Sequence, residues 1–469
     1  MNRFCALLIV ITFMAVGSLP CSLYAKEKST VRRSSRSLPN IIIVFADDQG
    51  YQDLGCFGSP NIKTPNIDQL AMEGIRFTSF YSAYCVCSAS RASLMTGCYQ
   101  PRLSMPGVLG PRSKVGLHPD EVTIADMLKT KGYATMCVGK WHLGDRPQTL
   151  PTAQGFDHYF GLPYSNDMAR VKDWGNKADD LDKIWELKKW DIYKNSLYRD
   201  TEIIESPLNQ VTMTERYTKE AVKFIRKNKD KPFFLYFPHT MVHVPLFVSE
   251  DRYDADPANA YKLAVEHIDW SVGQLQKTLA ELGINDNTLI VYTSDNGPWL
   301  SKKHHGGSAL PLRAGKGTTY EGGMRVPGVI RWPTRIPAGT ESDEVIGTID
   351  LLPTFASIVG AELPDHPIDG LDVSALLADP KIPSPHRKVG YFYYKNGKVE
   401  AVRRGKWKLR PLGKKTELYD LNSDISESNN VAQANSDVVN QLQQLIAKYD
   451  ADLKANKRPV WRVADDSNK

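Results

Sequence analysis

The amino-acid sequence predicts an α/β protein with a three-layer main domain, followed by a smaller α+β domain at the C-terminal end. Over the first two-thirds of the chain, apolar strand-like runs alternate with amphipathic helical stretches, as in helices packed on both faces of a sheet. Residues 40–46 (NIIIVFA) form a β-branched run without polar alternation, which is typical of a strand buried on both faces. Near residue 375 this pattern changes, and Asn396-Gly397 indicates a β-hairpin beyond it.

The elements of the main domain are predicted from their apolar patterns. A helix is expected over residues 64–77, because Thr64-Pro65 is a start signal and Ile67, Leu70 and Ile75 share one face. Further strands are expected at residues 133–138, 233–237 and 288–293, and further helices near residues 124–128 and 259–282.

The C-terminal part is predicted to begin with strands and to end in a helix. Two strand-like runs, residues 389–394 and 399–409, flank the Asn396-Gly397 turn, and a helix is expected over residues 438–454. We therefore predict a main domain over residues 38–375 and an α+β subdomain over residues 376–469.

The N-terminus has the features of a signal peptide. Arg3 supplies the positive charge, Phe4 to Val16 supply an apolar run, and small or polar residues follow up to a cleavage site after Ala25. The run is shorter than the ~20 apolar residues that span a bilayer, so no stable membrane insertion is expected. We predict residues 1–25 to be the signal peptide, residues 26–37 to be a disordered leader, and the protein to be exported, either periplasmic or secreted.

Charge and cysteine content narrow the class of protein. The net charge of +6 comes from scattered basic residues, which argues against nucleic acid as a partner and suits an anionic substrate. Beyond the predicted signal peptide an odd number of cysteines remains, so at least one is unpaired or chemically special. We expect four of them to be structural: Cys56, Cys85, Cys98 and Cys137.

Four predicted strands end directly in chemically reactive residues. Because ligands of open α/β sheets bind at the carboxyl ends of the strands, these residues are expected to meet at one edge of the sheet. They are Asp47-Asp48, Gly139-Lys140-Trp141-His142, the pair His239 and His243, and Ser294-Asp295-Asn296-Gly297.

The two acidic strand ends predict a metal site. Asp47, Asp48, Asp295 and Asn296 offer only oxygen ligands, and such a set favours calcium or magnesium over zinc. Each pair taken alone is also compatible with a solvated turn or a helix cap.

A cysteine-containing motif supplies the second chemical signal. Residues 87–97 (CSASRASLMTG) place Cys87 near a helix N-terminus, where backbone N–H groups and the helix dipole favour an anion. A structural cysteine beside an exposed Arg91 is the alternative.

These residues resemble a known family. The sequence Cys87-x-Ala89-x-Arg91 is similar to the sulfatase signature, in its rarer form with alanine at the third position. Further sulfatase-like stretches follow in family order from about residue 39 to residue 430, and the layout is most similar to arylsulfatase A and N-acetylgalactosamine-6-sulfatase. These stretches are residues 139–144 (GKWHLG), 312–327, 350–354 (DLLPT) and 417–421 (ELYDL).

The resemblance implies an alkaline-phosphatase-like αβα sandwich with a large mixed sheet, in which residues 38–375 form the catalytic domain. It implies hydrolysis of sulfate esters by formylglycine made from Cys87, which a formylglycine-generating or anaerobic sulfatase-maturating enzyme would produce. One hydroxyl of the hydrated aldehyde attacks sulfur, and the other then expels sulfate. It also implies one calcium ion, held by Asp47, Asp48, residue 87, Asp295 and Asn296.

The resemblance also implies roles for the remaining polar residues. Arg91 and Lys140 would hold the nucleophile, and His142 would be the base of the second step. Lys316 and His243 would bind sulfate, and one of them would protonate the leaving oxygen. Ser165 is a further candidate for substrate binding, with a turn serine as the alternative.

Some choices stay open at the level of sequence. His243, which precedes Val244-Pro245, fits the family pattern better than His239 does, and His304 and His305 are either loop histidines or substrate contacts. Residues 170–207 form either a packed surface excursion or an insertion that stacks on sugars through three tryptophans: Trp174, Trp185 and Trp190.

The natural substrate is expected to be a sulfated carbohydrate, with aryl sulfates as artificial substrates. The alternative enzymes are a phosphonate monoester hydrolase or phosphodiesterase of the same superfamily. A catalytically inactive carbohydrate-binding relative is the alternative from another class.

Overall fold

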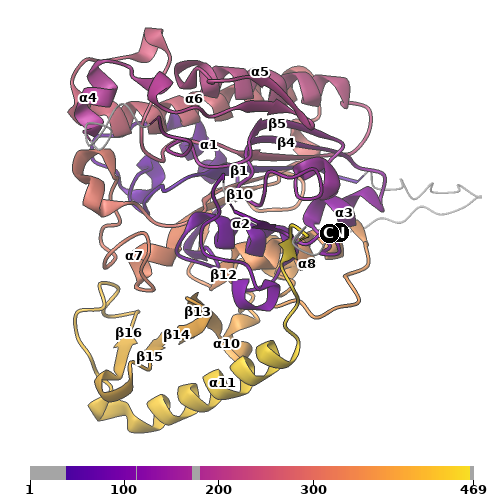
Figure 1. Cartoon of the computed structure of the whole chain (residues 1–469). Helices are drawn as coiled ribbons and strands as arrows, with labels where there is room; N and C mark the ends of the chain where they lie inside the picture. Colours follow the sequence, from indigo (N-terminus) through magenta and orange to yellow (C-terminus); the bar gives the residue numbers. More distant parts are fainter. Residues whose placement is uncertain (1–37, 112, 172–179, 465–469) are drawn as a thin grey trace, which may run out of the picture. The chain divides into compact units, whose positions relative to one another are not determined.

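The computed structural model describes residues 38–111, 113–171 and 180–464. The predicted signal peptide and leader lie outside these residues. A mixed sheet forms the centre of the structure (Figure 1). It has 11 strands in the order β11-β2-β10-β9-β1-β8-β4-β5-β6-β7, with β12 paired to β2. Its strands are β1 (Asn40–Ala46), β2 (Ile75–Tyr81), β4 (Ala134–Lys140), β5 (His158–Leu162), β6 (Leu197–Arg199), β7 (Glu202–Glu205), β8 (Phe233–Pro238), β9 (Thr288–Ser294), β10 (Arg325–Arg331), β11 (Thr340–Ser342) and β12 (Ile346–Gly347).

Helices cover both faces of this sheet, so the predicted three-layer fold is confirmed. On β1, Ile42 and Val44 face one apolar core and Ile41 and Ile43 face the other, and all four are fully buried. The first core contains residues of α1 (Pro65–Met72), α5 (Met213–Lys227) and α6 (Ala260–Glu281). The second contains residues of α2 (Cys87–Thr96), α3 (Ile124–Lys129), α8 (Leu351–Val359) and α9 (Ser374–Ala378). The remaining helices are α4 (Leu181–Glu186), α7 (Glu321–Met324), α10 (His386–Val389) and α11 (Ser436–Ala455).

The first predicted helix is shorter in the structure than in the prediction. The helix predicted over residues 64–77 ends at Met72, and Ile75 is the first residue of β2. The backbone passes very close to β10 between them, since a Cβ on Gly74 would lie 2.3 Å from the carbonyl oxygen of Ile330. The apolar residues of β2 continue the periodic pattern of the helix, so the sequence alone did not show where the helix ends and the strand begins.

The C-terminal part contains a second sheet, antiparallel in the order β13-β14-β15-β16, with α11 packed against β14 and β15 (Figure 1). Its strands are β13 (Tyr391–Lys395), β14 (Lys398–Arg404), β15 (Trp407–Arg410) and β16 (Glu417–Asp420). The turn at Asn396-Gly397 joins β13 and β14 as predicted, with φ values of 50° and 71°. The run 399–409, predicted as one strand, is instead two strands, because Gly405 with φ 58° turns the chain between them.

The proposed division at residue 375 remains a prediction, and that residue lies within α9.

A two-stranded sheet pairs β3 (Val115–Gly116) with β17 (Trp461–Arg462). None of the helices in the described part of the chain has the length and apolar character needed to cross a bilayer.

Candidate functional site

Neighbouring parallel strands bring the predicted polar residues together. Strands β9, β1, β8 and β4 are adjacent and parallel, so the residues that follow their carboxyl ends meet at one edge of the sheet. The resulting group, here called the strand-end cluster, is buried. It consists of Asp47, Asp48, Cys87, Arg91, Lys140, Asp295, Asn296 and Lys316.

Cys87 is the first residue of α2 and faces this cluster. Its Sγ atom lies 3.7 Å from Oδ1 of Asp47 and 3.6 Å from Nζ of Lys316. The side chain is 2% exposed, and burial raises the pKa of the Cys87 thiol although Lys140 and Lys316 oppose that rise. As an unmodified residue, Cys87 is therefore a neutral thiol and a poor nucleophile.

Arg91 lies one helical turn beyond Cys87 and shares its face of α2. Its Nη2 and Nε atoms donate to Oδ2 of Asp295 at 2.8 and 3.1 Å, and Nη1 donates to the carbonyl of Lys140 at 2.8 Å. The exposed arginine of the alternative interpretation is wrong, because this side chain is fully buried. Arg91 thus joins α2 to the ends of β9 and β4.

The two lysines of the cluster approach different aspartates. Nζ of Lys140 contacts Asp47 and lies 3.2 Å from Oγ of Ser165, and Nζ of Lys316 lies 2.7 Å from Oδ2 of Asp48. Burial raises the pKa of Asp48 despite the opposing charge of Lys316. Burial also raises the pKa of Asp295, and the neighbouring carboxylate of Asp47 adds to that rise. Three carboxylates and three basic side chains balance in number, yet the carboxylates of Asp48 and Asp295 are not fully stabilised.

The donor set fits a hard divalent cation. Nδ2 of Asn296 donates to Oδ1 of Asp48 at 2.7 Å and to the carbonyl of Gly297 at 2.9 Å. Its Oδ1 is buried and has no hydrogen-bond partner among the described residues. Ligand atoms of Asp47, Asp48, Cys87 and His243 all lie within 4.8 Å of one another. An unpaired amide oxygen beside crowded carboxylates is the environment that calcium or magnesium satisfies.

His142 is buried beside the cluster with its tautomer set by the backbone. Its Nε2 lies 2.8 Å from the carbonyl of Leu109, which can only accept, so Nε2 carries the proton. Nδ1 has no hydrogen-bond partner among the described residues. Burial and the charges of Lys140 and Arg91 hold the pKa of His142 well below its usual value. The ring is therefore neutral, with a free lone pair on Nδ1.

The structure separates the two histidines that follow β8. Nε2 of His243 lies 3.7 Å from Oδ2 of Asp48, while its Nδ1 donates to the carbonyl of Val244 at 2.7 Å. His239 instead packs its ring 4.4 Å from that of Phe237, and burial lowers its pKa to about 3. His243 is the one that reaches the cluster. The Oγ atom of Ser165 lies between Lys140 and His243, 3.2 Å from Nζ of the lysine and 3.4 Å from Nδ1 of the histidine.

Trp299 was not anticipated from the sequence and lies beside the cluster. Its ring centroid is 5.5 Å from that of His243 and 4.5 Å from Nζ of Lys316, and the side chain is half-buried. An aromatic residue directly after Ser294-Asp295-Asn296-Gly297-Pro298 was the available signal.

The tryptophans of the insertion lie differently from the prediction. Trp185 is 2% exposed, donates from Nε1 to the carbonyl of Asp254 at 2.8 Å and packs on Tyr253, so it cannot stack on a sugar. Trp190 is partly buried against the apolar core, and Trp174 lies outside the described residues. The packed surface excursion is the better interpretation for the described tryptophans.

Other predicted residues do not join the cluster. His304 and His305 contact Asp182 of α4. The five cysteines of the described chain are all free thiols.

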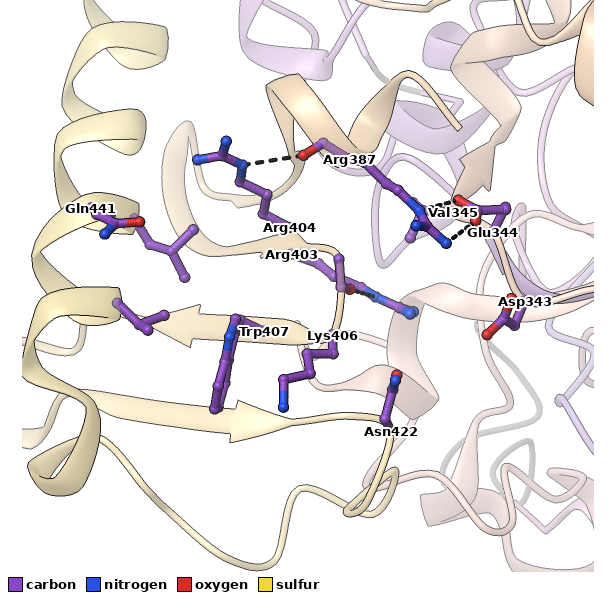
Figure 2. A pocket seen from close by; sticks show the side chains of 13 residues that line it. Asp343, Glu344, Val345, Arg387, Arg403, Arg404, Lys406, Trp407, Asn422 and Gln441 are labelled. Atoms are coloured by element: carbon purple, nitrogen blue, oxygen red, sulfur yellow. Dashed lines mark hydrogen bonds and ion pairs between the residues drawn. The ribbon is translucent and has the colours of Figure 1, made fainter. Parts of the chain in front are cut away.

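A separate cavity of about 500 Å³ lies against the C-terminal sheet and α11 (Figure 2). It contains several basic side chains, but they already have partners. Nε of Arg387 donates to Glu344 at 2.9 Å, and Nε of Arg404 donates to the carbonyl of Arg387 at 3.2 Å, as the dashed lines in Figure 2 show. None of the predicted site residues lines this cavity.

Comparison with known proteins places these features in a family context. The family model described as Sulfatase matches residues 39–361, and the model described as N-sulphoglucosamine sulphohydrolase, C-terminal, matches residues 315–452. The chain is 36% identical to human arylsulfatase A over 91% of each protein. It is 38% identical to N-acetylgalactosamine-6-sulfatase of Canis lupus familiaris, over 79% of this chain and 71% of that protein.

Solved structures give the same picture. The PsFucS1 sulfatase from Pseudoalteromonas sp. superposes with a TM-score of 0.80 at 29% identity, covering 90% of this chain and 92% of that chain. Ps i-CgsB in complex with k-i-k-neocarrahexaose superposes with a TM-score of 0.77 at 33% identity, covering 90% and 94%. The phosphonate monoester hydrolase of Agrobacterium radiobacter shares the fold, with a TM-score of 0.61 at 19% identity over 90% and 96% of the two chains.

Proposed function

The chain belongs to the sulfatase family of sulfuric ester hydrolases, and on this premise we propose that it hydrolyses sulfate esters of carbohydrates at the strand-end cluster. The proposal includes two finer elements, a formylglycine made from Cys87 and one bound calcium ion. The single observation that carries it is the position of Cys87, whose Sγ lies between the side chains of Asp47 and Lys316 at the start of a buried helix.

The charges of the cluster support anion binding once a cation is present. Asp47, Asp48 and Asp295 balance Arg91, Lys140 and Lys316 in number, so a divalent cation leaves a net positive site. We propose that Asp47, Asp48, residue 87, Asp295 and Asn296 hold the calcium ion. When bound, it would neutralise charge on the sulfate oxygens and on the nucleophile.

Formylglycine at position 87 would supply a hydrated aldehyde, with one hydroxyl to attack sulfur and a second that lets sulfate leave. Around that position, Arg91 fixes the carboxylate of Asp295, and Lys140 fixes that of Asp47. These contacts orient both carboxylates beside residue 87, where Asp295, whose pKa burial raises, can accept a proton from the attacking hydroxyl.

Two histidines are suited to move protons. His142 holds a free, unprotonated Nδ1 inside the protein, which is the state required of a base in the second step. Burial, Lys316 and Lys140 lower the pKa of His243. A bound sulfate ester offsets the charges of both lysines and so favours a protonated His243 that can deliver a proton to the leaving oxygen.

Lys140, Lys316 and Ser165 are proposed to bind the sulfate group. Lys316 stays cationic, because Asp48 raises its pKa against the opposing effect of burial. Ser165 lies within reach of both Lys140 and His243, so one hydroxyl orients two sulfate-binding groups.

A sulfated carbohydrate is proposed as the substrate, with Trp299 as the residue that packs on the sugar next to the sulfate. Trp299 supports this role because it is partly exposed, lies beside His243 and Lys316 and presents an aromatic ring. The relative Ps i-CgsB, solved with k-i-k-neocarrahexaose, is consistent with this substrate class.

We also propose that the chain is exported after cleavage following Ala25 and that a formylglycine-generating or anaerobic sulfatase-maturating enzyme modifies Cys87. Both proposals rest on the sequence alone. N-terminal sequencing of the mature protein tests the first.

The deciding experiment is peptide mass spectrometry of residue 87 in protein from its native host. Hydrolysis of p-nitrophenyl sulfate, of sulfated oligosaccharides and of a phosphonate monoester is measured on the same sample. We expect formylglycine and turnover of the sulfates that requires calcium. Unmodified Cys87 in folded, exported protein would refute the mechanism, and faster turnover of the phosphonate would refute the substrate class.

A further inference from the structure

Three potential metal ligands converge away from the strand-end cluster. Asp182 belongs to α4, and His304 and His305 end the 3₁₀ helix η10 (Leu300–His305). The Nε2 atoms of His304 and His305 lie 2.7 and 2.8 Å from the same oxygen, Oδ1 of Asp182. The ligand atoms of all three residues lie within 4.8 Å of one another, and the centroids of the two imidazole rings are 4.5 Å apart.

The backbone of η10 brings the two imidazoles to one side. Lys303 has a φ of 53°, which breaks the 3₁₀ geometry immediately before His304. The two consecutive histidines are therefore presented to α4, 122 and 123 residues away in sequence from their acidic partner. Such a convergence of distant segments is a product of tertiary structure.

The environment of His305 suits metal binding. Its side chain is 3% exposed, and its Nδ1 atom has no hydrogen-bond partner among the described residues. Neutral imidazole and ionised carboxylate are the forms that coordinate metals. Two imidazoles now compete for a single carboxylate oxygen, and an ion placed between the three groups would satisfy each of them.

We propose that Asp182, His304 and His305 form a second metal site, which binds a zinc-class divalent transition-metal ion with water in the open position. Mixed nitrogen and oxygen ligands favour zinc over calcium, in contrast to the oxygen-rich cluster at the sheet edge. With metal–ligand bonds of about 2.0–2.1 Å, tetrahedral ligand atoms stand roughly 3.3 Å apart. The side chains need to separate by only about half an ångström from their present contacts.

The site has a structural consequence for the neighbouring cluster. Trp299 is the N-cap residue of η10, and its ring lies beside Lys316 and His243. A metal ion bound by His304 and His305, at the C-terminal end of η10, would link this segment to Asp182 of α4. Binding is thus expected to stabilise the wall that carries Trp299 without contacting the reacting atoms.

The test is metal binding to the full chain, measured without substrate. Co²⁺ is titrated as a spectroscopic probe in excess Ca²⁺, which occupies the oxygen-rich cluster, and Zn²⁺ stoichiometry is determined by equilibrium dialysis. We expect one ion per chain, visible Co²⁺ absorption of a low-symmetry site, and at least a 10-fold loss of affinity in His304→Ala and in Asp182→Asn. Both substituted side chains are substantially exposed, at 38% and 48%, so folding should be preserved.

His158→Ala is the matched control. His158 forms an exposed pair with Asp200, with Nδ1 3.6 Å from the carboxylate, and no third ligand belongs to that pair among the described metal-competent groups. This variant should bind like the unmodified chain. Absence of a bound ion in the unmodified chain would overturn the proposal. So would affinity that survives His304→Ala but is lost in Asp48→Asn, because the ion would then belong to the strand-end cluster. The first result leaves the proposed sulfate hydrolysis untouched, whereas the second concerns the metal of the strand-end cluster.

Discussion

Two buried groups of charges in this protein are stabilised to different degrees. The strand-end cluster holds carboxylates whose pKa values burial raises, and in it the Oδ1 atom of Asn296 has no hydrogen-bond partner within the described part of the chain. The second group, here called the Glu321 network, consists of Glu321, Arg325, Arg403, Lys408 and Glu427. Burial alone would raise the pKa of Glu321 too, but Lys408 and Arg325 outweigh it and lower that pKa.

The contacts explain the contrast. Glu321 accepts from Tyr393 and Lys408 on one oxygen, at 2.8 and 2.9 Å, and from Tyr81 on the other, at 2.5 Å. These donors come from β2, β13 and β15, so the network ties the C-terminal sheet to the main sheet. The protein thus stabilises the Glu321 carboxylate with its own side chains, although burial still raises the pKa of Glu427 in the same network. We propose that the Glu321 network serves stability, whereas the strand-end cluster serves the binding of a cation and an anion.

The largest expected effect is on activity and arises from the cluster. His243→Ala removes the proposed proton donor and should lower kcat/KM by about 10²–10⁴-fold. The measurement is hydrolysis of p-nitrophenyl sulfate by protein with verified formylglycine content. His239→Ala is the control, because that ring is equally buried but packs on Phe237. Equal loss of kcat/KM in the two folded variants would contradict the assignment.

A large effect on stability should arise from the network. Lys408→Met leaves Glu321 and Glu427 buried without their shared cation, and the expected loss in free energy of unfolding is about 3–5 kcal/mol. Denaturant titration measures it. Lys406→Met is the matched variant, since Lys406 makes an exposed pair with Asp420 and its loss should change stability by about 1 kcal/mol or less. Similar losses in both variants would show that the network does not stabilise the fold.

Removal of calcium should lower stability through the strand-end cluster and not through the Glu321 network. If the ion completes the cluster, a calcium concentration of 100 times Kd contributes about 2.7 kcal/mol to the free energy of unfolding. Adding a calcium chelator should therefore lower Tm of the unmodified chain, and also of Lys408→Met, whose cluster is intact. A Tm that is unchanged by the chelator would show that the cluster is stable without the ion.

The smallest effect concerns the pH dependence of another completed pair. Nε2 of buried His386 lies 2.9 Å from Asp350, and although burial lowers the pKa of His386, Asp350 raises it above the usual value. The stabilisation is therefore complete below about pH 6.5, the usual pKa of histidine, and is lost as the pH rises through the raised pKa. Denaturant titrations at increasing pH above about 6.5 should show a falling free energy of unfolding. The variant His386→Asn should reduce the slope of that free energy against pH. An unchanged slope would exclude this pair as the source.

Much of the fold and of the cluster followed from local patterns in the sequence. The unbroken apolar run of residues 40–46 predicts a strand buried on both faces, because burial of every side chain leaves no polar alternation. Polar residues directly after such strands predict a site, since parallel neighbouring strands end at the same edge. Asp47, Lys140 and Asp295 were predicted in this way, whereas Cys87 and Arg91 were predicted because their motif resembles the sulfatase signature.

What only the tertiary structure decided were contacts between segments that are distant in sequence. The tertiary structure placed His243 near Asp48, whereas His239 packs on Phe237. It also buried Trp185 and placed Trp299 beside Lys316. It also joined His304 and His305 to Asp182, more than 120 residues away. Periodicity and motif spacing describe a residue's own element and the direction of its side chain. Which partner it meets depends on how elements pack, because burial, charge and hydrogen bonding are satisfied by the whole chain at once.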